Sequence, residues 1–261
     1  MVSRFIYSSL LFLFAIASQL SFATEEIIKV YTYHDKPPYV IFGQESNTIQ
    51  AGIYLELVNH LNANSSANND GLRYELSFLP RVRLESQLKT QQLDGIVIGV
   101  NPLWFGDSTK QKYLWSNTFM DDKDIFLVNS DSTIEFQQAS DLKGLTIALG
   151  RGTYYKGISE LIKQGKIKAA STNSSQQNLD MLAYQRADIT IMSELTANYF
   201  FNNGYPRSAF KILTKPHDTF QRSLLIPKSQ SHLLVFINRA LNKLNLNSDW
   251  LVEYDNWLVS I

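Results

Sequence analysis

A short glycine turn carries the first chemistry that the sequence suggests. Residues 150–153 read Gly-Arg-Gly-Thr, after a strand predicted at residues 145–149 and before a helix predicted at residues 154–164. The backbone N–H groups of Gly152 and Thr153, together with the positive end of the helix dipole, would form a small anion site. The alternative is a tight turn in which Thr153 only caps the helix. The pattern is not a dinucleotide fingerprint, because residue 155 is tyrosine where that motif requires a third glycine.

Polar residues also follow two strands of similar design. Residues 88–101 pass from the end of a helix through an aspartate into an apolar strand, and residues 182–193 repeat this order. Ligands of open α/β sheets bind beyond the carboxyl ends of the strands. We therefore expect Asn101 and Trp104 to face the same cleft as Ser193 and Glu194. Asp94 and Asp188 come before the strands, at the end away from this cleft, and are interpreted as turn residues.

Three aromatic residues stand on loops that follow apolar strands, namely Tyr33, Tyr39 and Trp104. In these positions their rings could stack on a ligand. Packing in the core or between two lobes is the alternative. His34-Asp35 could bind a metal, but the four histidines are scattered, and we expect no metal site. We also expect no cofactor. No serine lies in a nucleophile-elbow pattern and no set of acid and base residues stands out, so the sequence does not indicate an enzyme.

The elements that must position these residues alternate along the chain. Periodicity predicts strands near residues 27–33, 73–79, 95–100, 113–119, 124–128, 145–149, 189–192 and 220–226. Helices are predicted at residues 53–61, 82–90, 154–164, 178–186, 194–201, 232–244 and 250–258, with a polar Asn- and Ser-rich loop at residues 62–71. Strands that alternate with helices indicate an α/β fold with mainly parallel sheets.

Composition limits the cellular compartment in which we expect the protein and the classes of partner that it could bind. A basic start, an apolar run and the small residues around Ala23 predict a secretory signal peptide over residues 1–23, with an uncleaved membrane anchor as the alternative. The chain has no cysteine, which fits a bacterial periplasm better than an animal secretory pathway. Its 24 basic and 24 acidic residues balance, without the basic excess of a nucleic-acid binder.

The order of these signals resembles the family-3 periplasmic solute-binding proteins, the amino-acid-binding type of ABC transporter receptor. The matching pieces are Pro37-Pro38-Tyr39, Gly52 before the first helix, Pro80-x-x-Arg83, Gln92-Leu93-Asp94-Gly95 before a strand, Trp115-Ser116, Asp141-Leu142-Lys143-Gly144, Gly150-x-Gly152-Thr153 and Ala187-Asp188. The resemblance covers nearly all of the chain after residue 23. It implies a type II periplasmic-binding-protein fold, with residues 24–128 and 222–261 in lobe 1 and residues 129–221 in lobe 2. The ligand would bind between lobes that close by hinge motion.

The resemblance also assigns roles to residues, and two positions depart from it. The family places an arginine near the cleft on the second helix, here Arg83, with a solvated surface arginine as the alternative. The family usually grips the ligand carboxylate with an arginine on the loop where this chain has Lys110. It binds the ligand amino group with an aspartate where this chain has Ser193, beside Glu194. An ordinary α-amino acid is therefore in doubt as the ligand.

The sequence thus predicts a monomeric periplasmic protein that captures a small polar, carboxylate-bearing molecule for a membrane permease or a sensor receptor. Tyr33, Tyr39 and Trp104 would wall the cleft, Lys110 and Gly152-Thr153 would hold negative charge, and Ser193-Glu194 would hold a donor group. The resemblance also admits an enzyme on the same fold, similar to a cyclohexadienyl dehydratase, with Glu194 or His34 as its general acid.

Overall fold

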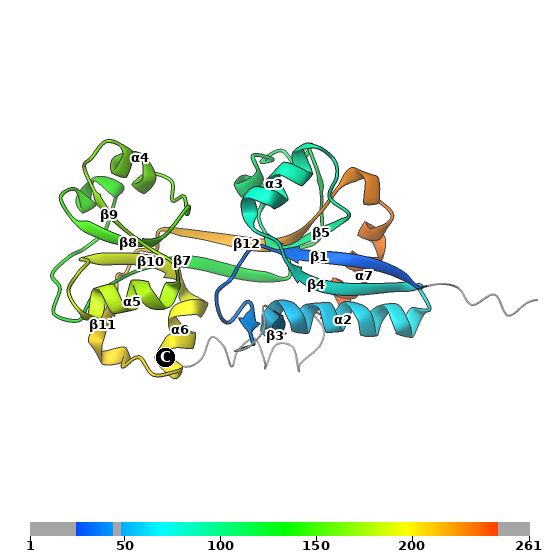
Figure 1. Cartoon of the computed structure of the whole chain (residues 1–261), viewed down its shortest axis with the longest axis horizontal. Helices are drawn as coiled ribbons and strands as arrows, with labels where there is room; N and C mark the ends of the chain where they lie inside the picture. Colours follow the sequence, from blue (N-terminus) through cyan, green and yellow to red (C-terminus); the bar gives the residue numbers. More distant parts are fainter. Residues whose placement is uncertain (1–24, 44–47, 245–261) are drawn as a thin grey trace, which may run out of the picture.

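The structure is a computed structural model that describes residues 25–43 and 48–244. The predicted signal peptide, the helix predicted at residues 250–258 and the end of lobe 1 lie outside these residues. Within them, no helix is both long and apolar enough to span a lipid bilayer. Figure 1 shows two halves joined by a pair of long strands.

The first half is built on a parallel sheet whose central strand comes early in the chain. Strand β1 (Glu26–Thr32) lies between β4 (Leu72–Phe78) and β5 (Gly95–Val100), and all six residues of β5 are buried. Such a strand is an apolar run because helices cover both faces of the sheet. Helices α2 (Ile53–Asn68) and α7 (Leu233–Leu244) pack on one face and α3 (Arg81–Lys89) on the other. A small hairpin of β2 (Ile41–Phe42) and β3 (Ile49–Ala51) precedes α2.

The second half repeats this arrangement with different connections. Its strands are β7 (Met120–Asn129), β10 (Ile189–Ser193), β8 (Thr146–Gly150) and β9 (Lys168–Thr172) in spatial order, with β11 (Phe210–Ile212) beside β7. Helix α4 (Ile158–Lys163) covers one face, and α5 (Ser175–Ala183) and α6 (Glu194–Asn202) cover the other. The described residues also form short 3-10 helices: η2 (Pro102–Phe105), η3 (Ala139–Leu142), η4 (Arg207–Ala209) and η5 (Lys228–Gln230).

Strands β7 and β12 join the two halves. Strand β12 (Asp218–Ile226) pairs with β7 along residues 218–222, then with β5 and β6 (Leu114–Trp115) along residues 223–226. The partner of β12 changes between residues 222 and 223, and a register shift between Ser223 and Leu225 then interrupts its pairing with β5. The expected lobe boundaries at residues 128 and 222 therefore fall near the end of β7 and inside β12. We call residues 120–124 of β7 with residues 218–222 of β12 the connecting ribbon (Figure 1).

The predicted loop at residues 62–71 is wrong over most of its length, because α2 continues to Asn68. Two of its polar side chains bond the outer edge of β4. Asn62 donates to the Tyr74 carbonyl and accepts from its N–H, and Ser65 donates to the Leu72 carbonyl. These hydrogen bonds therefore stabilise the helix on the sheet, although asparagine and serine both favour turns in isolation.

Helix α7 provides a direct test of the core. Leu241 is fully buried against the sheet, whereas Val235 on the same helix is 66% exposed. Leu241→Ala should lower the free energy of unfolding by about 2–5 kcal/mol, and Val235→Ala should change it by less than about 0.5 kcal/mol. Urea denaturation followed by circular dichroism measures both. Equal effects of the two changes would contradict this packing of α7.

Candidate functional site

The connecting ribbon presents two faces because successive strand residues point to opposite sides. The register pairs Phe220 with Asp122 and Asp218 with Asp124, and it pairs Thr219 with Lys123 and Gln221 with Asp121. We call the first side, which also carries Arg222, the Arg222 face. The second side is the Lys123 face.

Arg222 is the centre of the Arg222 face. Its side chain is 1% exposed, and its Nε and Nη2 donate to Asp122 Oδ2 at 2.7 and 2.6 Å. Its Nη1 donates to the Gly99 carbonyl oxygen at 2.6 Å, and the Tyr39 hydroxyl donates to the same Asp122 oxygen. A buried charge requires both a counter-ion and hydrogen-bond partners, and Arg222 has them. Its charge is therefore neutralised within the protein.

Aromatic rings surround this ion pair. The guanidinium carbon of Arg222 lies 4.4 Å from the ring centroid of Tyr39, 5.3 Å from that of Trp104 and 5.2 Å from that of Phe220. The Trp104 and Phe220 centroids are 4.9 Å apart with their planes at 71°. A cation on ring faces is held by the ring quadrupoles. The rings thus hold the guanidinium in place from both halves of the chain.

The loop after β1 adds a second layer of side chains. The His34 ring is stacked on Tyr33, with 4.3 Å between centroids, and lies 6.2 Å from the ring of Trp104. Burial, reinforced by the positive charge of Arg222, lowers the pKa of His34, so the imidazole is neutral at pH 7. Arg81 donates to the Tyr33 hydroxyl at 3.1 Å and to the Trp104 carbonyl at 2.7 Å. Burial raises the pKa of Tyr33 to about 12.

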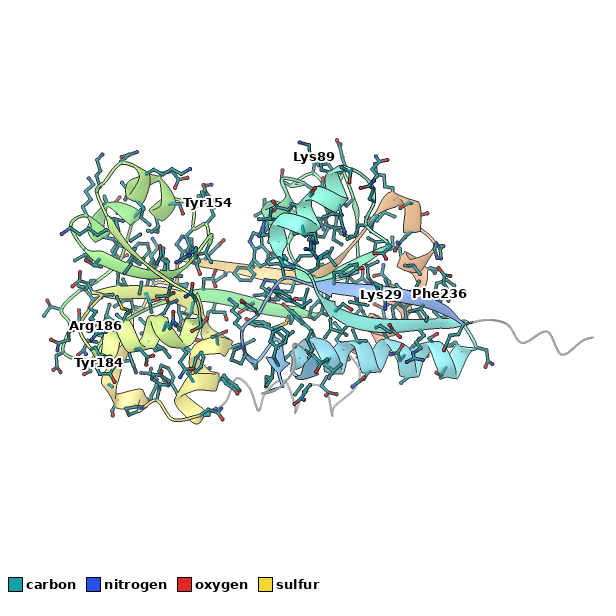
Figure 2. All side chains as sticks on the ribbon, viewed as in Figure 1. Lys29, Lys89, Tyr154, Tyr184, Arg186 and Phe236 are labelled. Carbon is teal, nitrogen blue, oxygen red and sulfur yellow. The ribbon has the colours of Figure 1, made fainter. Side chains whose placement is uncertain are left out.

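The second half contributes a wall next to Asp124. The rings of Tyr155 and His217 lie 5.2 Å apart, and His217 Nε2 is 3.0 Å from the Lys156 carbonyl oxygen. His217 Nδ1 is buried and has no hydrogen-bond partner among the described residues. Tyr154, the exposed residue before Tyr155, lies on the side of the second half that faces α3 (Figure 2).

Two charged side chains of this region are not neutralised by direct contact. Burial raises the pKa of the Asp124 carboxyl, with the Lys36 charge opposing this rise. Burial lowers the pKa of Lys36, and here the Asp124 charge opposes the change. Within the described part of the chain, neither side chain forms an ion pair or a hydrogen bond, and the Lys36 ammonium lies 5.5 Å from the Tyr39 ring centroid. The region thus keeps one negative and one positive group that interact at a distance.

The residues of the first half that were expected to bind ligand do not all lie in the same surroundings. Tyr33, Tyr39 and Trp104 do come together around Arg222 and His34. Tyr39 is fully buried, so it supports the site from beneath. Asn101 is structural in this arrangement, since its side chain caps η2 and donates to the Gln221 carbonyl of the ribbon.

The expected basic residues lie away from this cluster. Arg83 is on the exposed side of α3, and Arg81, two residues earlier, makes the contacts with Tyr33 and Trp104. Lys110 is exposed and belongs to a turn that Asp107 organises. The Asp107 carboxylate accepts from the N–H groups of Gln111, Lys112 and Tyr113 and from the Trp115 ring.

The glycine turn differs from its prediction. The helix expected at residue 154 begins at Ile158, so Gly152 and Thr153 lie on an exposed loop and not at a helix N-terminus. The Thr153 hydroxyl donates to the Gly150 carbonyl, and the N-cap of α4 is Gly157, whose N–H bonds the Glu160 carboxylate. Neither the helix dipole nor a threonine cap acts at this turn, which corrects both interpretations.

Ser193 and Glu194 point to different surroundings. Ser193 is fully buried, caps α6, and donates to the Thr196 hydroxyl, which in turn donates to the Pro37 carbonyl of the first half at 2.8 Å. Glu194 pairs with Lys123 at 2.8 Å, which places it with the Lys123 face. A cavity of about 430 Å³ opens beside this pair, and residues of both faces of the ribbon line it. It is lined by Asp121, Asp122, Lys123, Glu194, Leu195, Thr219, Phe220 and Gln221.

Sequence reasoning missed Arg222, Asp122, Asp124 and Lys36. An arginine two residues before the apolar end of the strand at residues 220–226 was the available signal, because a charge there needs a buried partner. The run Asp-Asp-Lys-Asp at residues 121–124 has the composition of a solvated segment and gave no such signal. Among the described residues, no group of three or more His, Asp or Glu side chains is placed to hold a metal ion.

Solved structures share this fold, although no protein-family model and no curated protein matches the chain. A mutant of ArgBP from T. maritima has a TM-score of 0.67 at 20% identity, over 89% of this chain and 95% of its own. An ancestral arginine-binding protein bound to arginine has 0.67 at 16% identity, over 90% and 99% of the two chains. The substrate-binding protein of an amino acid ABC transporter has 0.64 at 21% identity, over 88% and 98%. The predicted two-lobed periplasmic-binding-protein fold is therefore confirmed.

The buried ion pair should dominate the stability of the connecting ribbon. Asp122→Asn leaves the Arg222 charge buried without a counter-ion and should cost about 3–5 kcal/mol of unfolding free energy. Asp121→Asn on the exposed side of the same strand should cost less than about 1 kcal/mol. The double change Asp122→Leu with Arg222→Met should cost less than the sum of the two single changes, measured by urea denaturation. Simple additivity of the two would refute the coupling.

Gly99 should tolerate no side chain. Its φ is +76°, and a Cβ atom would come within 2.0 Å of the Tyr54 hydroxyl oxygen. Gly99→Ala should therefore cost at least about 2 kcal/mol more than Gly152→Ala, whose φ of +78° imposes similar backbone strain in open space. Thermal unfolding of both variants measures the difference. Similar melting temperatures would mean that Tyr54 does not pack against Gly99.

Proposed function

We propose that this protein captures a small polar molecule, an amino acid or a related carboxylate, between its two halves. The observation that carries the proposal is a pair of opposite charges, Asp124 on the ribbon and Lys36 on the loop after β1, that form no ion pair or hydrogen bond with the described residues. They lie beside the aromatic cluster, with the Lys36 ammonium 5.5 Å from the Tyr39 ring centroid. Small-molecule sites are apolar hollows with a few fixed polar groups that orient the ligand. The aromatic rings supply the apolar walls here, and the two charges supply the orientation.

The structural neighbours favour this class of ligand. The names of two of them state that they bind arginine or belong to an amino acid ABC transporter. An ancestral arginine-binding protein is also known bound to glutamine. We take the same transport role for this chain. It would act as a monomer in the periplasm after cleavage behind Ala23 and would deliver its ligand to a membrane permease or a sensor receptor.

The connecting ribbon would act as the hinge. Its two strands are the covalent link between the halves, and a few residues there could absorb the change of backbone angles on closure. Ligand groups that contact Trp104 from the first half and Asp124 from the ribbon would favour the closed arrangement. A ligand shifts such an equilibrium only by its difference in affinity for the two states.

The residues that an enzyme would need are less well placed. Glu194, one candidate for the general acid, is paired with Lys123 on the Lys123 face. His34, the other, has a lowered pKa and is neutral at pH 7, so it holds no proton to donate as an imidazolium. These features support capture without turnover as the better proposal.

Calorimetry and thermal shift with the mature chain test the proposal. A ligand at a hundred times its dissociation constant should add about 2.7 kcal/mol to the free energy of unfolding. Trp104→Ala removes an aromatic wall and should weaken binding at least about tenfold. Tyr184→Ala, a matched loss of an exposed ring, should leave binding unchanged, because Tyr184 lies at the end of the molecule away from the ribbon (Figure 2). The proposal fails if no amino acid or small carboxylate stabilises the chain, or if both variants bind alike.

A further inference from the structure

Asp124 occupies a special position in the sheet. The register of β7 places it directly opposite Ser193 on β10 and opposite Asp218 on β12. Opposed residues of antiparallel strands point to the same side, with their Cβ atoms close together. Asp124 therefore lies beside Ser193, the position where the resemblance placed an aspartate for the ligand amino group. The carboxylate that is missing from β10 is present one strand away.

Ser193 cannot take that role itself. Its hydroxyl donates to Thr196, accepts from the Thr196 N–H, and is fully buried. The Arg222 face carries two other carboxylates. Asp122 is held by Arg222 and Tyr39, and Asp218 is exposed and accepts from the Thr219 N–H. Asp124 is thus the half-buried carboxylate of this face whose oxygens accept no hydrogen bond from the described residues.

The charges near Asp124 do not neutralise it. Those that act on it come from several elements: Lys36 on the loop after β1, Asp122 on β7, Arg222 on β12 and His217 before β12. Asp218 is its exposed neighbour in register, and the hydroxyls of the half-buried Tyr33 and Tyr155 also face its charge. Arg222 is already paired, and Lys36 is not within ion-pair distance. A partly buried carboxylate without a partner is costly unless a cation arrives.

We propose that Asp124 binds the cationic group of the ligand and that Lys36 binds its carboxylate. This assignment rests on the proposed capture of an amino acid and makes it more specific. The ligand would carry an ammonium or guanidinium group together with a carboxylate. Free organic acids and sugars would lack the group that Asp124 requires.

The stability of the unliganded protein gives a test that needs no ligand. The raised pKa of Asp124 means that this carboxyl supports the fold while protonated, and that this support is lost as the pH rises through the raised pKa. Asp124→Asn should therefore raise the melting temperature by about 2 °C or more at about pH 8, and the gain should vanish at about pH 4. A lower melting temperature for Asp124→Asn at about pH 8 would show that the carboxylate has a stabilising partner, and it would overturn the assignment.

Binding provides the second test. The standard protein amino acids are titrated by calorimetry into the unaltered chain, and the tightest binder is then used as the probe for the variants. Asp124→Asn should weaken binding of this probe by about 30-fold or more, and Lys36→Met should weaken it at least about tenfold. Asp121→Asn removes the same charge from the Lys123 face and should leave the affinity unchanged.

The outcomes separate this inference from the proposed function. If none of the amino acids binds the unaltered chain, the capture of an amino acid fails and this assignment fails with it. If a probe binds the unaltered chain and Asp124→Asn equally well, capture stands and the assignment is wrong. If Asp121→Asn loses binding while Asp124→Asn keeps it, the ligand belongs in the cavity of the Lys123 face.

Discussion

The ion pair between Arg222 and Asp122 is the interaction on which the rest of this structure depends. It places a guanidinium inside a strand whose following residues, Ser223 to Ile226, are all buried, so its partners must be brought to it. Asp122 comes from the other strand of the ribbon, the Gly99 carbonyl from the end of β5, and the Tyr39 hydroxyl holds the aspartate in place. Four separate segments of the chain are thus fixed by one charge. The loop after β1, the end of β5 and both strands between the halves consequently meet at the same point.

This arrangement also decides which charges remain for other molecules. Because Asp122 neutralises the charge of Arg222 within the protein, this guanidinium contributes little net charge to its surroundings. The charges that remain at the Arg222 face are then the exposed Asp218, the half-buried Asp124 and, from the loop after β1, the half-buried Lys36. Half-buried groups of this kind respond strongly to neighbouring charge, since each is held in a less favourable state by desolvation. On β7, the carboxylate that pairs with Arg222 and the carboxylate without an ion-pair partner among the described residues therefore lie only two positions apart.

The sequence predicted the α/β class, the two-lobed fold and the aromatic cluster of Tyr33, Tyr39 and Trp104, because these depend on local periodicity and on the order of strands and loops. It did not predict how charges pair across the ribbon. Whether Asp121, Asp122 or Asp124 meets Arg222 depends on the register of two strands about a hundred residues apart, as the pair 122 and 222 shows. The start of α4 was also misplaced, since the aromatic residues 154 and 155 continue a helical pattern while the backbone remains in a loop until Ile158. Tertiary contacts override local preference at such places.

The hydrogen bonds between α2 and the outer edge of β4 have a consequence beyond the stability of the helix. Strand β4 is the outer strand of its sheet, and an uncovered outer strand offers its backbone groups to any other chain that can pair with it. Asn62 and Ser65 occupy such groups at Tyr74 and Leu72. Asn62 and Ser65, which look like part of an unstructured linker in the sequence, therefore protect the outer edge of β4 from pairing with a strand of another molecule. Replacing them with better helix formers would strengthen α2 locally and leave the sheet open to self-association.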